Sequence, residues 1–258
     1  MIPFIKASAC GNDFLIIDGA HAPAAMAEFT RQICDRHNGV GADGVEWLFP
    51  APDGDIEARL INADGSEAEI SGNGTRCVAA CVASQSGITT LAIRTGAGIK
   101  RCDLISREGN LFEFETTMGT PAAGREIAIG GVKGMEVSTG NPHFVIFVDD
   151  YPPDWRERGA EIGRHPHFPQ GVNVEFVKVT GRNDLEVRFF ERGAGETQSS
   201  GTGSCASAVA AIASGRASSP VKVHAAGGTQ TVRWENDVVF LRGPARIICR
   251  GEFLEGKD

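Results

Sequence analysis

Apolar and polar side chains alternate most clearly in Leu185–Phe190, where the pattern breaks only at the closing Phe-Phe pair. Such alternation predicts a strand with one buried face. Ala58–Ile61 is a shorter run of the same kind, and a turn-rich segment follows each run. Further short β-rich runs predict strands at Phe14–Asp18, Leu91–Arg94, Phe144–Val148, Val172–Val179, Thr229–Trp234 and Val238–Leu241.

Two stretches of small, almost uncharged residues have a different pattern. They begin after Gly74 and Gly203 and are rich in Ala, Val, Cys and Ser. The spacing predicts helices that end near Gly87 and Gly215, because glycine is the usual residue just past a helix C-terminus. A helix that is apolar nearly all round is expected to be buried.

The loop before each helix is a repeat. Ser71-Gly72-Asn73-Gly74-Thr75 returns half a chain length later as Ser200-Gly201-Thr202-Gly203-Ser204. The repeat predicts an α/β (α+β) fold of two pseudo-symmetric halves, each a β-sheet or barrel wrapped around a buried central helix. We place the changeover near Met118–Pro121, giving an N-terminal half 1–119, completed by a C-terminal strand 246–258, and a C-terminal half 120–245.

The repeated loops have the chemistry of an anion site. Glycines let the backbone approach a ligand, and the first N–H groups of a helix point outward at the positive end of its dipole. Neither loop has the Gly-Lys-Ser/Thr ending of a nucleotide P-loop or sits in a dinucleotide fingerprint. If the halves face each other, the two loops can grip one carboxylate-bearing ligand from opposite sides. That arrangement suits inversion of a stereocentre.

Composition narrows the protein class. The 258 residues carry a formal charge of −8, and no dense Lys/Arg cluster is present, which argues against nucleic-acid and anionic-membrane partners. We find no apolar run of membrane-spanning length and no export signal at the N-terminus. Seven scattered cysteines favour reduced thiols over a disulfide framework. We therefore expect a cytoplasmic protein.

Several longer motifs carry a family resemblance. They are Gly11–Phe14, Asp35–Gly44, Asn62–Ser66, Gly72–Cys77, Gly140–His143, Asn173–Phe176, and Glu191–Thr197 with Gly201–Gly203. Together they resemble the diaminopimelate epimerases, cofactor-independent members of the amino-acid racemase and epimerase group, over essentially the whole chain. The resemblance implies two pseudo-symmetric α/β halves with the active site in the cleft between them.

The resemblance also implies that two cysteines flank the substrate α-carbon, one as thiolate base and the other as thiol acid. Ser71 and Ser200 occupy those positions here. A serine hydroxyl is several pKa units less acidic than a thiol, so forming its alkoxide costs on the order of 5 kcal/mol more. We expect proton abstraction to be about 10³-fold slower unless a neighbouring base acts on the serine. His143 and Glu191 are the candidates for that base.

Other family positions match residues that bind substrate. Asn12, Asn62, Asn173 and Arg192 match those for the distal amino-acid end, and backbone groups of Gly72, Asn73, Gly201 and Thr202 match those for the reacting carboxylate. Asn141 and His143 match the Asn-Pro-His element beside the site, and Glu191 matches the acidic residue at the α-amino group. The turn-forming tendency of Asn and Gly offers a structural alternative for each residue taken singly. The resemblance implies no cofactor, no metal and a homodimer.

Three functions remain open at this stage. The first is epimerisation of L,L- and meso-diaminopimelate, for lysine and peptidoglycan precursors. The second is a related amino-acid isomerisation or dehydration with an altered acid/base pair. The third is a catalytically silent amino-acid-binding protein, which the change at both acid/base positions favours.

Overall fold

The chain folds into two compact units, which the computed structural model describes over residues 1–254. Unit 1 comprises Met1–Thr116 and the chain from Gly243 onward, and unit 2 is Thr117–Arg242. The final strand, β17 (Val238–Phe253), contributes its first residues to unit 2 and the rest to unit 1. The predicted C-terminal strand 246–258 includes residues 255–258, which lie outside the described part of the chain.

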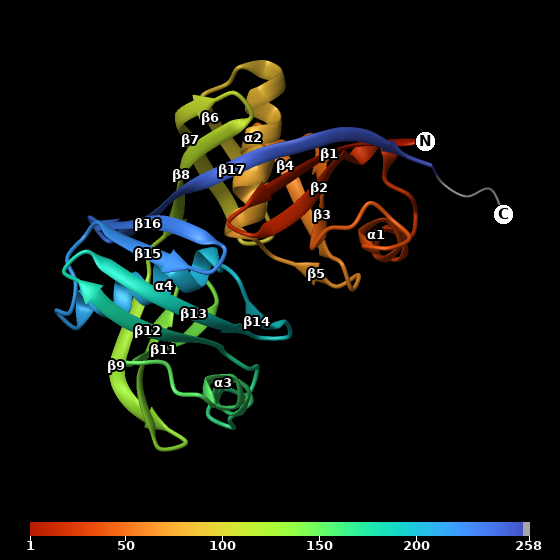
Figure 1. Cartoon of the computed structure of the whole chain (residues 1–258). Coiled ribbons are helices and arrows are strands. Elements are labelled where there is room, and N and C mark those ends of the chain that lie inside the picture. Colours follow the sequence, from red (N-terminus) through yellow and green to blue (C-terminus); the bar gives the residue numbers. More distant parts are fainter. Residues whose placement is uncertain (255–258) are drawn as a thin grey trace. The chain divides into compact units, whose positions relative to one another are not determined.

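The strands of unit 1 form a closed barrel (Figure 1). Their spatial order is β17–β1–β2–β3–β4–β6–β7–β8, and β8 pairs with β17 in turn. The β2–β3 and β4–β6 pairs are parallel, and the other pairs whose register is known are antiparallel. The strands are β1 (Ile2–Ala9), β2 (Asn12–Asp18), β3 (Gly44–Phe49), β4 (Ile56–Asn62), β5 (Glu67–Ala68), β6 (Thr90–Thr95), β7 (Gly98–Glu108) and β8 (Leu111–Gly119).

Unit 2 repeats this order of strands. The spatial order of its strands is β9–β10–β11–β12–β13–β15–β16–β17. Parallel and antiparallel pairs follow one another as in unit 1, with β11–β12 and β13–β15 parallel. The predicted fold class, two pseudo-symmetric halves of mixed α and β structure, is therefore confirmed. The strands are β9 (Ala122–Ile129), β10 (Val132–Ser138), β11 (Pro142–Phe147), β12 (Asn173–Gly181), β13 (Asp184–Glu191), β14 (Gly195–Thr197), β15 (Val221–Ala225) and β16 (Gly228–Glu235).

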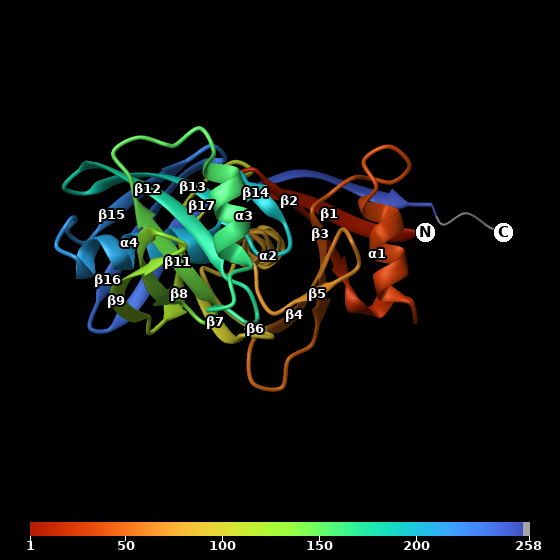
Figure 2. The same ribbon diagram turned by 90° about the horizontal axis from the view of Figure 1, so that it is seen from below.

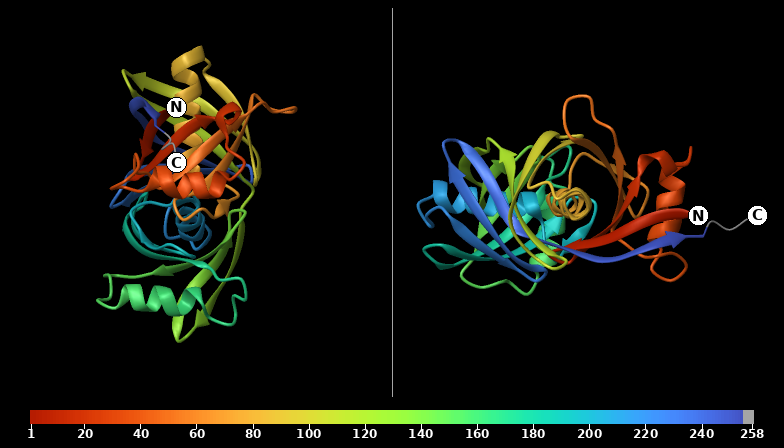
Figure 3. Two further views of the ribbon diagram at one scale, coloured as in Figure 1. Left: turned by 90° about the vertical axis from the view of Figure 1, so that its right-hand side faces the viewer. Right: turned by 90° about the horizontal axis from the view of Figure 1, so that it is seen from above.

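Each unit has a buried helix inside its strands, as predicted (Figure 3). These are α2 (Gly72–Ser86) and α4 (Gly201–Ala213), whose small side chains let the surrounding strands approach closely. Helix α2 ends where Gly87 takes a left-handed conformation with φ 74°, and Gly215, just beyond α4, has φ 71°. Both glycines are the predicted stop residues.

Two outer helices were not predicted from the sequence. Helix α1 (Met26–Cys34) packs Phe29 and Ile33 against the outer side of unit 1, and α3 (Trp155–Gly163) packs Trp155 and Ile162 against β12 and β13 (Figure 2). A short 3₁₀ turn, η1 (Gly19–His21), precedes α1. Each outer helix is the crossover between two parallel strands, β2 to β3 and β11 to β12.

The predicted strand positions agree with the structure. Each of the eight predicted runs falls in a strand, although Phe144–Val148 and Val172–Val179 each overrun theirs by one residue. Within residues 1–254, no helix is long and apolar enough to cross a membrane.

Candidate active site

Ser71 and Ser200 are the N-cap residues of the two buried helices. Both have an extended backbone, with φ/ψ of −123°/122° at Ser71 and −135°/125° at Ser200. The Ser71 Oγ accepts a hydrogen bond from the Gly74 N–H at 3.0 Å, and the Ser200 Oγ accepts one from the Gly203 N–H at 3.1 Å. Each hydroxyl therefore lies at the positive end of a helix dipole, where a developing negative charge on oxygen is favoured.

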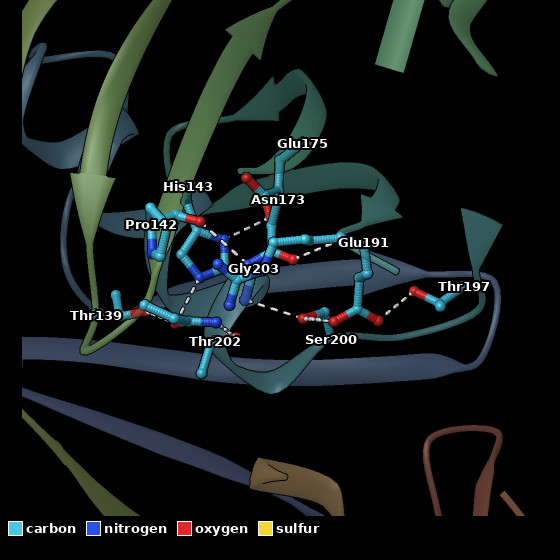
Figure 4. Close-up of polar contacts among 12 residues, drawn as sticks. Thr139, Pro142, His143, Asn173, Glu175, Glu191, Thr197, Ser200, Thr202 and Gly203 are labelled. Atoms are coloured by element: carbon cyan, nitrogen blue, oxygen red, sulfur yellow. Dashed lines mark hydrogen bonds and ion pairs between the residues drawn. The ribbon is translucent and has the colours of Figure 1, made fainter. Parts of the chain in front are cut away.

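Ser200 is also paired with a carboxylate (Figure 4). Its Oγ donates to Glu191 Oε2 at 2.9 Å, and Thr197 Oγ1 donates to Glu191 Oε1 at 2.6 Å. Glu191 ends β13 and pairs with Gly195 of β14, so the tight hairpin between these strands sets the position of its carboxylate. Of the two predicted bases for a serine, Glu191 is the one that contacts Ser200.

His143 takes part in a different network. Its Nδ1 lies 2.7 Å from Glu175 Oε1, and its Nε2 lies 2.9 Å from Asn141 Oδ1. Asn141 Nδ2 in turn donates to Thr202 Oγ1 at 3.4 Å, near the start of α4. The Asn141 amide oxygen, an acceptor, faces Nε2, and the Glu175 carboxyl group faces Nδ1. Both ring nitrogens are thus engaged by residues other than serine.

The Glu175 side chain is fully buried beside His143. Burial raises the pKa of its carboxyl group, whereas the charge of the neighbouring imidazole opposes that rise. Its Oε2 is buried without a hydrogen-bond partner. The His143–Glu175 pair consequently fixes the orientation of Asn141 from inside unit 2.

Asn173, the first residue of β12, is hydrogen-bonded to Arg192. Asn173 Nδ2 donates to the Pro142 carbonyl at 3.1 Å, and its Oδ1 accepts from the Arg192 N–H at 2.9 Å. The Arg192 side chain is exposed and donates from Nη1 to the Gln170 carbonyl at 3.0 Å. Arg192 and Glu191 line a cavity of about 530 Å³ in unit 2, large enough for part of an amino-acid ligand.

In unit 1 a chain of amides leads to the start of α2. Asn73 Nδ2 donates to Asn12 Oδ1 at 2.6 Å, and Asn12 Nδ2 donates to Asp43 Oδ2 at 3.1 Å. Asn73 Oδ1 accepts from Arg76 Nη2 at 2.5 Å. Arg76 is fully buried and also donates to the carbonyl groups of Gly72 and Pro244. This buried guanidinium holds the first turn of α2 against the barrel wall.

Asn62 lies in a turn of its own. Its Nδ2 donates to Ser66 Oγ at 3.0 Å, and Ser66 bonds Asp64 through both its N–H and its Oγ. The structure therefore groups Asn12, Asn73 and Ser71 at one end of α2 and gives Asn62 a turn-closing contact. In unit 2 it groups Asn141, His143 and Thr202, and separately Glu191 with Ser200.

The cysteines near the helix starts are packing residues. Cys77 and Cys205 are both fully buried, and burial raises the pKa of the Cys77 thiol and that of Cys81, the latter to about 11. Cys10 has a left-handed backbone with φ 49°, and its Sγ lies 3.9 Å from Arg76 Nη2. Among residues 1–254 no group of three His, Cys, Asp or Glu side chains could hold a metal ion.

Three buried residues near the helix starts were not identified from the sequence: Glu46, Arg76 and Glu175. Glu46 and Glu175 are separated by the same number of residues as Ser71 and Ser200. Comparing the two halves beyond the glycine loops would have detected this pair.

Known proteins are similar to this chain over nearly its whole length. The family model described as diaminopimelate epimerase matches residues 4–123 and 135–248. Diaminopimelate epimerases from Pelotomaculum thermopropionicum and Desulfitobacterium hafniense are each 38% identical to the chain, covering 97% of it and 98% of the relative.

Solved structures share the fold at lower sequence identity. A predicted epimerase from Pseudomonas aeruginosa has a TM-score of 0.77 at 18% identity, covering 99% of this chain and 100% of that one. A probable proline racemase from Agrobacterium radiobacter with bound carbonate has a TM-score of 0.76 at 17% identity, covering 98% of this chain and 92% of that one. At these identities the likeness concerns the fold alone. The full-length match to the curated relatives establishes that this chain belongs to the diaminopimelate epimerase family.

Proposed function

We propose that the chain is a cofactor-independent isomerase that interconverts L,L- and meso-diaminopimelate by two-base proton transfer at the α-carbon. The observation that carries this proposal is the hydrogen bond from Ser200 Oγ to Glu191 Oε2 at 2.9 Å. It gives a hydroxyl at a helix N-terminus a proton acceptor, which a serine needs to remove an α-proton.

The proposed reaction requires both Ser71, from the proposed half 1–119, and Ser200, from the proposed half 120–245, to act on the substrate α-carbon. Ser200 takes the α-proton and passes its own proton to Glu191, while Ser71 delivers a proton to the opposite face. The backbone groups of Gly72, Asn73, Gly201 and Thr202 hold the α-carboxylate. Their helix dipoles stabilise the negative charge that develops on it.

The distal end of the substrate is assigned to Asn12, Asn62, Asn173 and Arg192. Arg192 supplies a guanidinium that can hold a carboxylate in bidentate fashion, and its position beside the 530 Å³ cavity supports this role. Asn141 and His143 order the start of α4 through Thr202. The reaction belongs to lysine and peptidoglycan precursor synthesis, and we place the protein in the cytoplasm as a homodimer.

One observation favours a silent amino-acid-binding protein instead. Both serine hydroxyls accept N-cap hydrogen bonds, so they stabilise α2 and α4 whether or not they transfer protons.

Incubation with L,L-diaminopimelate in deuterated water, followed by NMR of the α-carbon, tests the proposal. It is run on the chain itself and on the Ser71→Cys/Ser200→Cys variant, with binding measured by calorimetry. Exchange by the serine form supports a working serine epimerase. Exchange by the double-cysteine form alone indicates a disabled epimerase. Binding without exchange in both identifies the silent binder, and loss of binding counts against diaminopimelate as the ligand.

A further inference from the structure

Two buried glutamates occupy equivalent positions in the two units. Glu46 pairs with Ile16 and Leu60 in the barrel of unit 1, and Glu175 takes the matching place on β12 of unit 2. Glu46 is 3% exposed and Glu175 is 0% exposed. Each side chain points inward, from the fourth strand in the spatial order of its unit, toward the buried helix.

Each carboxyl group lies against the start of that helix. A Cβ atom added to Gly74 would lie 2.1 Å from Glu46 Oε1 and 3.2 Å from the Ser71 Cβ. A Cβ added to Gly203 would lie 2.8 Å from Glu175 Oε1. The Glu46 carboxyl and the Ser71 side chain therefore border the same space over the Gly74 α-carbon.

The two units differ in what accompanies the glutamate. Glu175 has His143 at 2.7 Å, whereas the residue of unit 1 at the same offset is Phe14. Over residues 1–254 the structure contains no hydrogen bond or ion pair to the Glu46 carboxyl. Burial alone raises its pKa to about 8, with no contribution from a neighbouring charge, so the group is a neutral acid at pH 7.

The two units also differ in the residue that accompanies the N-cap serine. The counterpart of Glu191 at the same offset is Asn62, whose amide cannot exchange a proton with a serine and is bonded to Ser66. Ser71 therefore has no carboxyl where Ser200 has Glu191, but the Glu46 carboxyl borders the same space over Gly74 as the Ser71 side chain.

We propose that Glu46 is the proton partner of Ser71, reaching it across the space over Gly74 that both side chains border, whereas Glu191 is already hydrogen-bonded to Ser200. The inference rests on the proposed epimerase function. When Ser71 Oγ–H gives its proton to the carbanion and forms the new C–H bond, Glu46 gives its own proton to Ser71 Oγ. Glu191 has meanwhile received one proton through Ser200. One carboxyl is neutralised and the other ionised, so the charge of the protein is unchanged. In the reverse direction Ser71 passes its proton to the Glu46 carboxylate.

A double-mutant comparison tests this role. Glu46→Gln is made in the parent chain and in Ser71→Cys, and interconversion of L,L- and meso-diaminopimelate is followed in deuterated water. We expect a loss of about 10²-fold in the serine chain, the usual contribution of one general acid or base, and less than about 3-fold in the cysteine chain. A thiol is acidic enough to transfer its proton without the help of a neighbouring carboxyl group.

The exchange pattern supplies a second readout. In Glu46→Gln the Ser200–Glu191 pair is intact, so one stereoisomer should still exchange its α-proton for deuterium without inverting. Glu57→Gln, whose carboxylate contacts surface Arg59, is the matched control and should behave as the parent.

The outcomes separate the two proposals. An equal loss in both backgrounds would show a structural role and overturn the assignment of Glu46. Full activity of Glu46→Gln in the serine chain would overturn it as well, while leaving the epimerase function intact. Binding of diaminopimelate without any exchange by the parent chain would overturn the epimerase function, and the role of Glu46 with it.

Discussion

His143 Nδ1 and Glu175 Oε1 are 2.7 Å apart with both side chains fully buried, and unit 1 has Phe14 and Glu46 at the corresponding places. One unit therefore has a buried hydrogen-bonded pair where the other has a single neutral acid. This difference separates the electrostatics of two halves whose strand order is the same.

Removing one partner of the buried pair should be costly. We expect Glu175→Leu to lower the free energy of unfolding by about 3 kcal/mol, because His143 Nδ1 then lacks a partner away from water and only Nε2 keeps one, Asn141. Adding His143→Phe, the residue found at the equivalent position of unit 1, should recover part of that loss. Urea denaturation measures both values. A double variant as unstable as the sum of the single changes would show that the two residues do not interact energetically.

Glu46 should make stability fall as pH rises. Its folded pKa of about 8 lies above the ordinary value of 4.5, so the native state retains a proton that the unfolded chain releases. Its contribution is complete below pH 4.5 and is lost as pH increases through 8. We expect Glu46→Gln to gain about 3 kcal/mol over the parent at pH 7, and more at pH 8. Thermal unfolding from pH 4 to 9 measures this gap, and curves that stay parallel would contradict it.

Gly74 should not tolerate a side chain while Glu46 is present. A Cβ at residue 74 would fall 2.1 Å from Glu46 Oε1, so Gly74→Ala should destabilise the protein by about 1–3 kcal/mol. Gly163→Ala is the control, because its Cβ would meet only the Val172 carbonyl at 3.4 Å. Chemical denaturation compares the two variants. If shortening residue 46 to alanine fails to relieve Gly74→Ala, the steric explanation is wrong.

Restoring thiols at the helix starts should accelerate proton transfer. Since an alkoxide costs on the order of 5 kcal/mol more than a thiolate, Ser71→Cys/Ser200→Cys should raise the α-proton exchange rate by about 10³-fold. It should also weaken both N-caps, by up to about 1 kcal/mol each, because sulfur is a poor acceptor. Deuterium exchange and thermal melting report the two effects. Ser86→Cys at the exposed end of α2 should leave the exchange rate unchanged.

The sequence predicts those parts of the structure that depend on local residues. The two small-residue helices and the stop at Gly87 follow from neighbouring residue types, and the structure agrees, although it begins the helices at Gly72 and Gly201, with Ser71 and Ser200 as caps, rather than after Gly74 and Gly203. Burial of Glu46 or Arg76 depends on which distant strands enclose α2. The neighbouring sequence does not distinguish a charged residue that is buried in this way from one that is exposed. The contact of Glu191 with Ser200 likewise depends on the β13–β14 hairpin bringing its carboxylate to the start of α4. The outer helices α1 and α3 were missed because the β-rich runs around them dominate the pattern.

The close approach of Glu46 to Gly74 constrains the order in which these positions can change during evolution. A larger residue at position 74 requires the Glu46 carboxyl group to move or to be lost, whereas a glutamate can arise at 46 while 74 is glycine. Lineages of this family that keep a long acid at 46 should therefore retain glycine at 74. Those that lost the acid first are the ones free to vary there. Residues 46 and 74 are therefore expected to vary together among members of the family.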